Sequence, residues 1–174
     1  MNTDLTKVAI VGTGLIGAGW AAFYASKGLA VSLFDADTTA RQAGRERTLT
    51  YLAFLREHGL LDPEGHDRAV AGVAVAGDLS EAVEGAGLVQ ESVTERYDVK
   101  KDVFRQIDRA AAAGAIVASS SSGLLISELQ TVMEHPGRRL IRGTLTTQAR
   151  NKRANRESEF LLHGLRFKDR HDPE

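Results

Sequence analysis

Residues 7–34, KVAIVGTGLIGAGWAAFYASKGLAVSLF, decide the fold of this chain. They open with a short β-branched run, residues 7–11, which is typical of a strand buried on both faces of a parallel sheet. Residues 15–27 are rich in alanine and aromatic residues and precede Gly28, a pattern that predicts a buried helix ended by glycine. Residues 30–34 predict a second strand. This stretch therefore predicts one compact βαβ unit.

The rest of the chain keeps alternating helical patterns with short apolar runs. Strands are predicted at 73–76, 88–91, 115–118 and 139–142, and helices at 38–57, just after 62–63, at 97–113 and at 125–133. The expected core contacts of the 38–57 helix are Leu49, Leu52, Phe54 and Leu55. Trp20 is expected to pack in the core rather than to form a stacking platform. The alternation predicts an α/β fold, a Rossmann-type doubly wound parallel sheet with right-handed crossovers.

Composition narrows the classes of function. The chain has 174 residues, 43% of them hydrophobic, which predicts one soluble globular domain. Its 22 basic and 23 acidic residues nearly cancel, so nucleic acid and anionic membranes are not expected partners. The absence of cysteine excludes disulfides and thiolate chemistry, and no spacing of His, Asp and Glu suggests a metal site. Without a signal-peptide pattern or a membrane-spanning segment, we expect a cytoplasmic protein.

A glycine motif lies where the first predicted strand turns into the first predicted helix. It has the dinucleotide-binding form G-x-G-x-x-G and reads Gly12-Thr13-Gly14-Leu15-Ile16-Gly17. Gly12 permits the tight turn, Gly14 lets the backbone approach a pyrophosphate, and Gly17 allows close helix packing. The helix start also offers N–H groups and the positive end of its dipole to phosphates. The candidate cofactor contacts are Gly12, Gly14, Leu15, Ile16 and Gly17.

Asp35 ends the second predicted strand, about 20 residues after the glycine motif. A carboxylate at this position accepts hydrogen bonds from the adenosine ribose and repels a 2′-phosphate, which favours NAD over NADP. An alternative interpretation gives Asp35 or Asp37 the role of capping the next helix. The motif and Asp35 together predict an NAD site.

Three ordered blocks extend this pattern along the chain. They are VAIVGTGLIGAGW at 8–20, LVQESVTERYDVKKDVF at 88–104 and IVASSSSGL at 116–124, followed by HPGRRLI at 135–141. In this order they resemble the N-terminal domain of the 3-hydroxyacyl-CoA dehydrogenase family, including its L-gulonate, carnitine and lambda-crystallin branch. The resemblance implies an NAD-dependent oxidoreductase that reversibly oxidises a 3-hydroxyl to a 3-keto group by hydride transfer to NAD.

The resemblance also implies roles for three side chains. The family's cofactor-contacting Glu and Lys fall on Glu95 and Lys100, and the Ser that binds the substrate hydroxyl beside the nicotinamide falls on Ser122. The alternative for Glu95 and Lys100 is a solvated helix start with an acidic first turn. The alternative for Ser122 is an ordinary turn residue or helix cap.

The resemblance ends where the catalytic base of the family is expected. In the family, a histidine follows the sixth strand, begins a His-Pro-(Phe/Tyr)-Asn-Pro segment and removes the hydroxyl proton. In this chain Gly143 is followed by Thr144 at that position. A threonine hydroxyl does not titrate near neutral pH and cannot serve as a general base. We therefore do not extend the expected dehydrogenase activity to this chain alone.

The sequence after residue 142 departs from the family. We predict an NAD-binding domain at 1–142 and an atypical basic tail at 143–174, with the chain truncated before the helical C-terminal domain of the family. Two explanations of the tail stay open. It is a genuine tail, or it is read in a shifted frame. In the second case, codons GGC ACC CTT ACA ACC CAA for residues 143–148 contain His-Pro-Tyr-Asn-Pro one frame away.

None of the five histidines stands in a motif that matches the catalytic position; they are His58, His66, His135, His163 and His171. Two classes of function therefore stay open. One is a dehydrogenase acting on a 3-hydroxyacyl-CoA or a 3-hydroxy acid, and the other is a non-catalytic NAD-binding module or a split-enzyme subunit that needs a partner chain. The expected partners are NAD and such a substrate, with a partner chain or a homo-oligomer. The SSSSGLL stretch, together with a helix after Asp35 that lacks a CoA-binding pattern, favours a small hydroxy acid.

Overall fold

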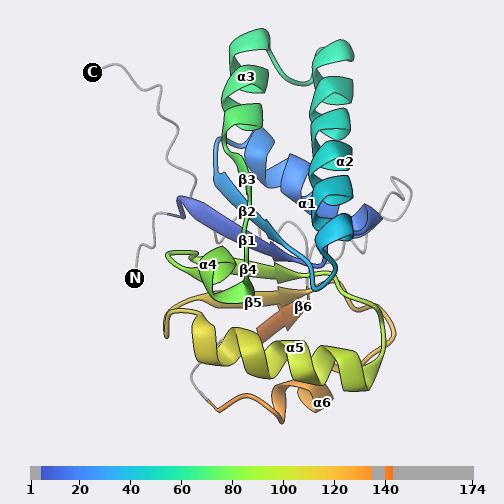
Figure 1. Ribbon diagram of the computed structural model, residues 1–174, viewed down its shortest axis with the longest axis vertical. Coiled ribbons are helices and arrows are strands. Elements are labelled where there is room, and N and C mark those ends of the chain that lie inside the picture. The colour runs from blue at the N-terminus through green and yellow to red at the C-terminus, as the bar shows by residue number, and fades with distance from the viewer. Residues whose placement is uncertain (1–4, 135–139, 143–174) are drawn as a thin grey trace, which may run out of the picture.

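The computed structural model describes residues 5–134 and 140–142, and it contains one six-stranded parallel sheet with helices on both faces (Figure 1). The strand order is β3-β2-β1-β4-β5-β6. The strands are β1 (Lys7–Val11), β2 (Ala30–Phe34), β3 (Val73–Val75), β4 (Leu88–Glu91), β5 (Ile116–Ser119) and β6 (Leu140–Arg142). The helices are α1 (Leu15–Ser26), α2 (Thr38–Glu57), α3 (Pro63–Ala71), α4 (Leu79–Val83), α5 (Tyr97–Ala110) and α6 (Ile126–Gln130). The predicted doubly wound α/β fold is confirmed.

Strand β1 lies in the middle of the sheet and contributes to two separate hydrophobic cores. Val8 and Ile10 pack with residues of α1, α2 and α3. Ala9 and Val11 pack with residues of α4 and α5 on the opposite face. Because side chains alternate along a strand, burial on both faces requires an unbroken apolar run, which is what the β1 sequence contains.

Most predicted elements coincide with the observed ones, and the differences have local causes. Helix α5 ends at Ala110, three residues before its predicted end at 113, because Ala111 is extended and a turn joins Ala112 to Ala115. Strand β5 is shifted by one residue from its prediction, and α6 is shorter than the predicted 125–133 helix. Helix α4 was not predicted, because five residues are too short to display helical periodicity.

One predicted core contact of α2 is wrong. Leu52 is fully buried, and Leu49 and Leu55 pack against the same core, but the Phe54 side chain is 53% exposed. Its ring stacks instead on His58, with 3.9 Å between ring centroids, on the outer side of the helix. Trp20 is 8% exposed within the core, as predicted.

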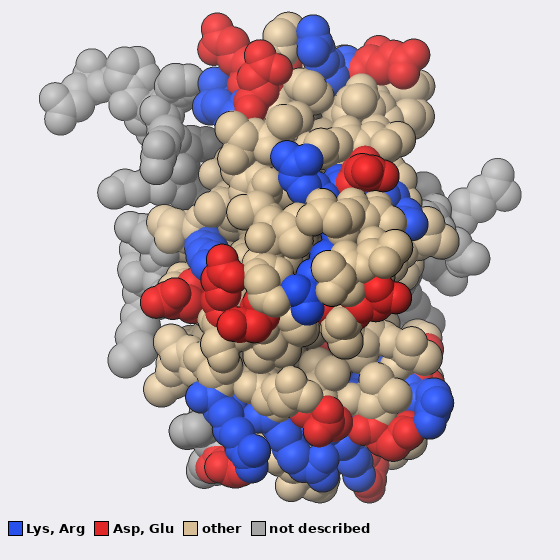
Figure 2. Space-filling view, in the orientation of Figure 1, with Lys and Arg blue, Asp and Glu red and all other residues tan. Residues whose placement is uncertain are grey.

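The surface carries charges of both signs, interspersed over the face in Figure 2. Two cations on α5 have acidic neighbours: Lys101 lies 3.9 Å from Glu128, and Arg109 lies 2.8 Å from Glu134. In the part of the chain that the structure describes, no helix combines the length and apolar character needed to cross a membrane.

Candidate dinucleotide-binding site

The strand order places the topological switch point of the sheet at the carboxyl ends of β1 and β4, and we call this region the crevice. These strands are neighbours, yet the helices that follow them pack on opposite faces of the sheet, α1 on one and α5 on the other. Connections that diverge in this way leave a gap at the strand ends, which is where open α/β sheets bind ligands. The glycine motif follows β1 and residues 92–96 follow β4, so both border this crevice.

The glycines of the motif are required by close contacts. Gly12 has a φ of +93°, and a Cβ at Gly12 would lie 2.6 Å from the backbone carbon of Ser92. A Cβ at Gly17 would lie 1.9 Å from the carbonyl oxygen of Gly12. A Cβ at Gly14, in contrast, would meet no atom of the described residues within 4 Å. The first and last glycines therefore allow the turn and the helix packing, and the space beside the middle one is open.

Helix α1 begins differently from the three helices that follow it. Asp37, Asp62 and Asp78 cap α2, α3 and α4 with their carboxylates. Gly14 at the start of α1 provides no side-chain cap, and the first turn contains no acidic residue. The helical hydrogen bonds begin with Ala18 N, which donates to Gly14 O at 2.9 Å. The N–H groups that precede Ala18 in this turn therefore make no hydrogen bond within the helix. This end of α1 is suited to an anion.

Asp35 lies directly beside the glycine turn. Its Oδ2 accepts from the backbone N–H of Thr13 at 2.8 Å, and its Oδ1 accepts from the N–H of Asp37 at 3.2 Å. The proton of the Thr13 hydroxyl is directed to Ala40 O at 2.8 Å. A carboxylate has about four acceptor positions, so Asp35 retains capacity for a ribose hydroxyl. Asp37, rather than Asp35, caps α2 by accepting from Thr39 N at 2.7 Å.

Two arginines lie at this end of the crevice: Arg47 Nη1 donates to Thr13 O at 3.1 Å, and Arg41 binds the strand ends. Its guanidinium donates to the carbonyl oxygens of Asp35 and Gly77, each at 2.5 Å, and stacks over the Phe34 ring at 4.5 Å. These contacts join the ends of β2 and β3. The guanidinium therefore links the ends of these two strands, and it uses its donors on the protein rather than on a phosphate.

A buried ion pair connects the elements that follow β4. Lys100 Nζ donates to Glu91 Oε1 at 2.5 Å and to Val93 O at 3.1 Å, and the two charged side chains are 1% and 0% exposed. Glu91 also accepts from Val93 N at 2.7 Å and from Ser119 Oγ at 2.6 Å. The pair therefore joins β4, the loop after it, α5 and β5. The structure places the predicted cofactor contact Lys100 inside this pair.

Two other predicted site residues, Glu95 and Ser122, lie together. Glu95 Oε1 accepts from the N–H groups of Ser122 at 2.8 Å and Gly123 at 2.7 Å. These two backbone N–H groups hold the pKa of the Glu95 carboxyl below its usual value. Ser122 Oγ is 3.4 Å from both oxygens of Glu95, so its hydroxyl is only weakly engaged. The loops after β4 and β5 are thus joined at the mouth of the crevice.

A hydrogen-bonded group on the α1 side of the crevice was not predicted from the sequence. Ser120 Oγ lies 3.2 Å from Trp20 Nε1, 2.9 Å from Gln90 Nε2 and 2.8 Å from Ser92 Oγ. Trp20 also stacks on Tyr24, with 5.4 Å between ring centroids. We call Trp20, Gln90, Ser92 and Ser120 the Ser120 cluster. No local motif could have revealed it, because its members come from α1, β4 and β5 and the residues that directly follow these strands.

Some predicted features fall elsewhere. Thr144 and the 143–174 segment lie outside the described residues, as do His135, His163 and His171. His58 and His66 are on the α2–α3 hairpin, where His66 Nδ1 lies 3.1 Å from Asp67. Among the residues that the structure does describe, no group of three or more His, Asp or Glu side chains is arranged to hold a metal ion.

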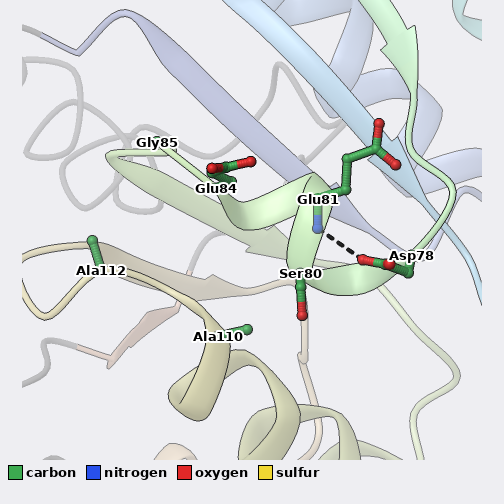
Figure 3. Close-up of a pocket in the computed structure, with 7 residues that line it drawn as sticks. All are labelled: Asp78, Ser80, Glu81, Glu84, Gly85, Ala110 and Ala112. Atoms are coloured by element: carbon green, nitrogen blue, oxygen red, sulfur yellow. Dashed lines mark hydrogen bonds between the residues drawn. The ribbon is translucent and has the colours of Figure 1, made fainter.

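An open pocket of about 570 Å³ lies between α4 and the end of α5 (Figure 3). Its acidic residues are Asp78, Glu81 and Glu84. The Asp78 carboxylate accepts from Glu81 N at 2.8 Å, and the Glu81 carboxylate accepts from Gly77 N at 2.6 Å. These acids serve the start of α4 and would repel an anionic ligand. None of the residues that line this pocket is a predicted cofactor contact, so the pocket is separate from the dinucleotide crevice.

Comparison with known proteins gives the family. Residues 7–143 match the family model described as the 3-hydroxyacyl-CoA dehydrogenase, NAD binding domain. The L-carnitine dehydrogenase of Streptomyces griseus is 39% identical over 140 residues, which cover 79% of this chain and 40% of that protein. A lambda-crystallin homolog of Rattus norvegicus is 38% identical over 129 residues, which cover 74% of this chain and 40% of that protein.

A solved structure gives the same result for the fold. The 3-hydroxybutyryl-CoA dehydrogenase from Escherichia coli K12 superposes with a TM-score of 0.75 at 25% identity, covering 82% of this chain and 30% of that one. The chain thus spans less than half the length of each of these relatives. What it shares with them is the dinucleotide-binding part.

Proposed function

Because this chain belongs to the 3-hydroxyacyl-CoA dehydrogenase family and carries its NAD-binding domain, we propose how its residues divide the cofactor. Asp35 receives the adenosine ribose, and the start of α1 with Gly14 receives the pyrophosphate. The observation that carries this assignment is the Asp35 carboxylate, which is held beside the glycine turn by Thr13 N at 2.8 Å with acceptor capacity left over. The open space at Gly14 supports it.

The nicotinamide half is assigned to the ends of β4 and β5. Along the sheet, β2 with Asp35 is on one side of β1, and β4 and β5 are on the other, so an extended dinucleotide reaches from Asp35 toward Glu95 and Ser122. When bound, NAD supplies the acceptor for a hydride. Glu95 fixes the Ser122 backbone, and the weakly engaged Ser122 hydroxyl is left to orient the substrate hydroxyl. Lys100 holds the loop that carries Glu95 through its bond to Val93 O.

The proton acceptor is the part that this chain does not supply in the expected form. Thr144 stands where a histidine is expected, and a hydroxyl cannot take a proton near neutral pH. We therefore infer that residues 1–142 bind NAD, with 143–174 a separate segment, and that the chain alone does not turn over substrate. Turnover then requires a partner chain or second domain that provides a base and covers the substrate. The alternative is a purely NAD-binding module.

The substrate class that we propose is a small 3-hydroxy acid. Support comes from the SSSSGLL stretch and from relatives named as L-carnitine dehydrogenases. A hydroxyacyl-CoA is the other candidate, because the superposed Escherichia coli protein is named for 3-hydroxybutyryl-CoA. Both share a 3-hydroxyl group, whose carbon gives up the hydride while its oxygen gives up the proton.

Calorimetric titration with NAD tests the cofactor assignment. We expect Asp35→Ala to weaken NAD binding at least about tenfold, because a charge-assisted bond to ribose is lost. Asp62→Ala is the matched control, since it removes another helix-adjacent carboxylate, at the start of α3, and should leave NAD affinity unchanged. Equal affinity of wild type and Asp35→Ala would refute the assignment of Asp35.

Two further measurements separate the classes of function. NADH formation is followed with L-carnitine, L-gulonate and 3-hydroxybutyryl-CoA. Tight NAD binding without NADH formation supports the binding module or split enzyme, whereas turnover by the chain alone contradicts our inference about Thr144. The nucleotide sequence at codons 143 and 144 tests the tail, because the shifted frame requires cytosine at the third position of each.

A further inference from the structure

The hydrogen bonds of the Ser120 cluster have a direction that can be deduced from donor and acceptor counts. A serine hydroxyl has two acceptor lone pairs and one proton. The indole N–H of Trp20 can only donate, and it lies 3.2 Å from Ser120 Oγ. If the amide nitrogen of Gln90 also donates to this oxygen, both lone pairs are filled, and Ser120 must use its own proton elsewhere.

The orientation of the Gln90 amide is fixed by a second contact. The amide nitrogen that lies 2.9 Å from Ser120 Oγ also lies 3.3 Å from the backbone carbonyl oxygen of Glu91. Glu91 O also accepts from Ser120 N at 2.9 Å, and the buried Gln90 Oε1 has no hydrogen-bond partner among the described residues. The reversed amide would leave the NH₂ group in that place instead and would put two acceptors 3.3 Å apart, so the stated orientation is favoured. Gln90 is fully buried, which holds this orientation. Trp20 and Gln90 therefore fill both lone pairs of Ser120.

The proton of Ser120 is consequently donated to Ser92 Oγ, which lies 2.8 Å away. Ser92 then acts as acceptor in this bond, and its own proton is available for another acceptor. Within the described residues, Ser92 Oγ has no second hydrogen-bond partner. Ser92 is half-buried at the carboxyl end of β4, which borders the crevice.

Ser92 also borders the glycine turn. It is the first residue after β4, its N–H donates to Val11 O at 2.7 Å, and its backbone occupies the space that a Gly12 side chain would need. Asp35 is on the far side of β1 from Ser92, because β2 and β4 flank that strand. A dinucleotide held by Asp35 and the glycine turn therefore extends past Ser92 with its nicotinamide half.

We propose that the Ser92 hydroxyl is a directed hydrogen-bond donor to the ribose or carboxamide oxygen of the nicotinamide half, oriented by Trp20, Gln90 and Ser120. This inference rests on the proposed NAD site and adds a positioning contact to it. Trp20 and Gln90 occupy both acceptor positions of Ser120, and Ser120 donates to Ser92, before any ligand binds. The ligand therefore meets a donor whose proton is already directed outward, which reduces the ordering cost of binding.

Calorimetry with two ligands tests the proposal. NAD contains the nicotinamide half, whereas ADP contains the adenosine ribose and both phosphates without it. We expect Ser92→Ala to weaken NAD binding about three- to tenfold, the usual effect of one hydrogen bond, and to leave ADP binding unchanged. Ser92→Thr keeps a hydroxyl and should bind NAD within about twofold of wild type. Ser26→Ala is the matched control, because it removes a hydroxyl bonded to Phe23 O at the other end of α1.

The outcomes distinguish this inference from the proposed function. NAD and ADP binding by wild type, with equal NAD affinity in Ser92→Ala, overturns the role of Ser92 and leaves the NAD site intact. Equal weakening of NAD and ADP in Ser92→Ala also overturns it, because the contact is then to the phosphates or to the fold. Absence of NAD and ADP binding in wild type overturns the proposed site, and the Ser92 contact with it.

Discussion

On the β2 side of the crevice backbone geometry does most of the positioning, whereas on the β4–β5 side hydrogen-bonded side chains do, most of them buried or half-buried. The β2 side consists of a glycine turn, an uncapped helix start and Asp35, which is tied to backbone N–H groups. The β4–β5 side consists of the Glu91–Lys100 pair, the Glu95 bonds to two backbone N–H groups, and the Ser120 cluster. The two sides of the proposed NAD site are thus built in different ways.

The difference teaches which changes each side tolerates. Backbone positioning fails when a side chain is added, because a Cβ then occupies space that the turn needs. Side-chain positioning fails when a group is removed, because a buried charge or polar atom then loses its partner. The four predictions that follow test this contrast, beginning with the largest expected effect.

Removing one member of the buried ion pair should cost the most. Lys100→Met leaves the Glu91 carboxylate buried without its cation, and we expect a loss of about 3–5 kcal/mol in the free energy of unfolding. The measurement is chemical denaturation of wild type and variant. Lys101→Met, in the next position of α5, is the control. It removes a surface cation that lies 3.9 Å from Glu128 and should change the free energy of unfolding by less than about 1 kcal/mol.

A second variant makes this prediction sharper. Adding Glu91→Gln to Lys100→Met removes the unpaired charge while keeping an acceptor for Ser119 Oγ. We expect the double variant to be more stable than Lys100→Met alone. If Lys100→Met unfolds like wild type, the β4–β5 side does not depend on the pair, and the contrast between the two sides is lost.

Adding a methyl group to the glycine turn should separate packing from ligand binding. Gly17→Ala places a Cβ 1.9 Å from Gly12 O, and we expect a loss of about 1–3 kcal/mol together with impaired NAD binding. Gly14→Ala meets open space in the protein, so its stability should match wild type while its NAD affinity falls. Thermal unfolding and NAD titration of both variants provide the check. Equal stability of the two variants would argue against the backbone construction of this side.

Removing the hydroxyl at the centre of the Ser120 cluster should have a smaller effect. Ser120→Ala takes the acceptor from Trp20 and Gln90, and we expect about 1–2 kcal/mol of destabilisation by denaturant titration. The cost is limited because Ser120 is half-buried and water can replace part of the bonding. Ser26→Ala, whose hydroxyl bonds only to its own helix turn, should unfold within about 0.5 kcal/mol of wild type.

The smallest effect should come from the titration of Glu95. Its carboxyl has a pKa below the ordinary 4.5 because it accepts from the N–H groups of Gly123 and Ser122. A depressed pKa stabilises the folded state above the unfolded pKa, and this contribution disappears as the pH falls through the folded pKa. The amide resonances of these two residues should therefore shift with a midpoint below 4.5 in wild type. In Glu95→Gln they should not titrate in that range.

The sequence predicted the fold well, because the decisive signals are local. The βαβ unit of residues 7–34, its glycine turn and the buried runs of β1, β2 and β4 each depend on neighbours in sequence. The two errors of the sequence prediction also have local causes. Helix α4 is too short to show periodicity, and Phe54 has a core residue type but faces outward beside His58.

The residues of the candidate site also divide into those with a local sequence signal and those without one. Gly12, Gly17 and Asp35 were predicted from a motif, and the structure places them around one turn. Glu95 and Ser122 came from a family resemblance, and they are brought together across the crevice. The bonds from Glu91 to Ser119 and from Ser92 to Ser120 each join residues 28 positions apart in the chain, so the sequence carries no local sign of them.

Trp20 gives the molecule a built-in optical probe. It is the only tryptophan of the chain, and its indole N–H is bonded to the cluster that ends at Ser92. Indole emission overlaps the absorption band of a reduced nicotinamide ring, so excitation can pass from Trp20 to NADH held in the crevice. Occupancy can then be followed by fluorescence without any label. Because the chain has one indole, each change in tryptophan emission reports one location in the fold.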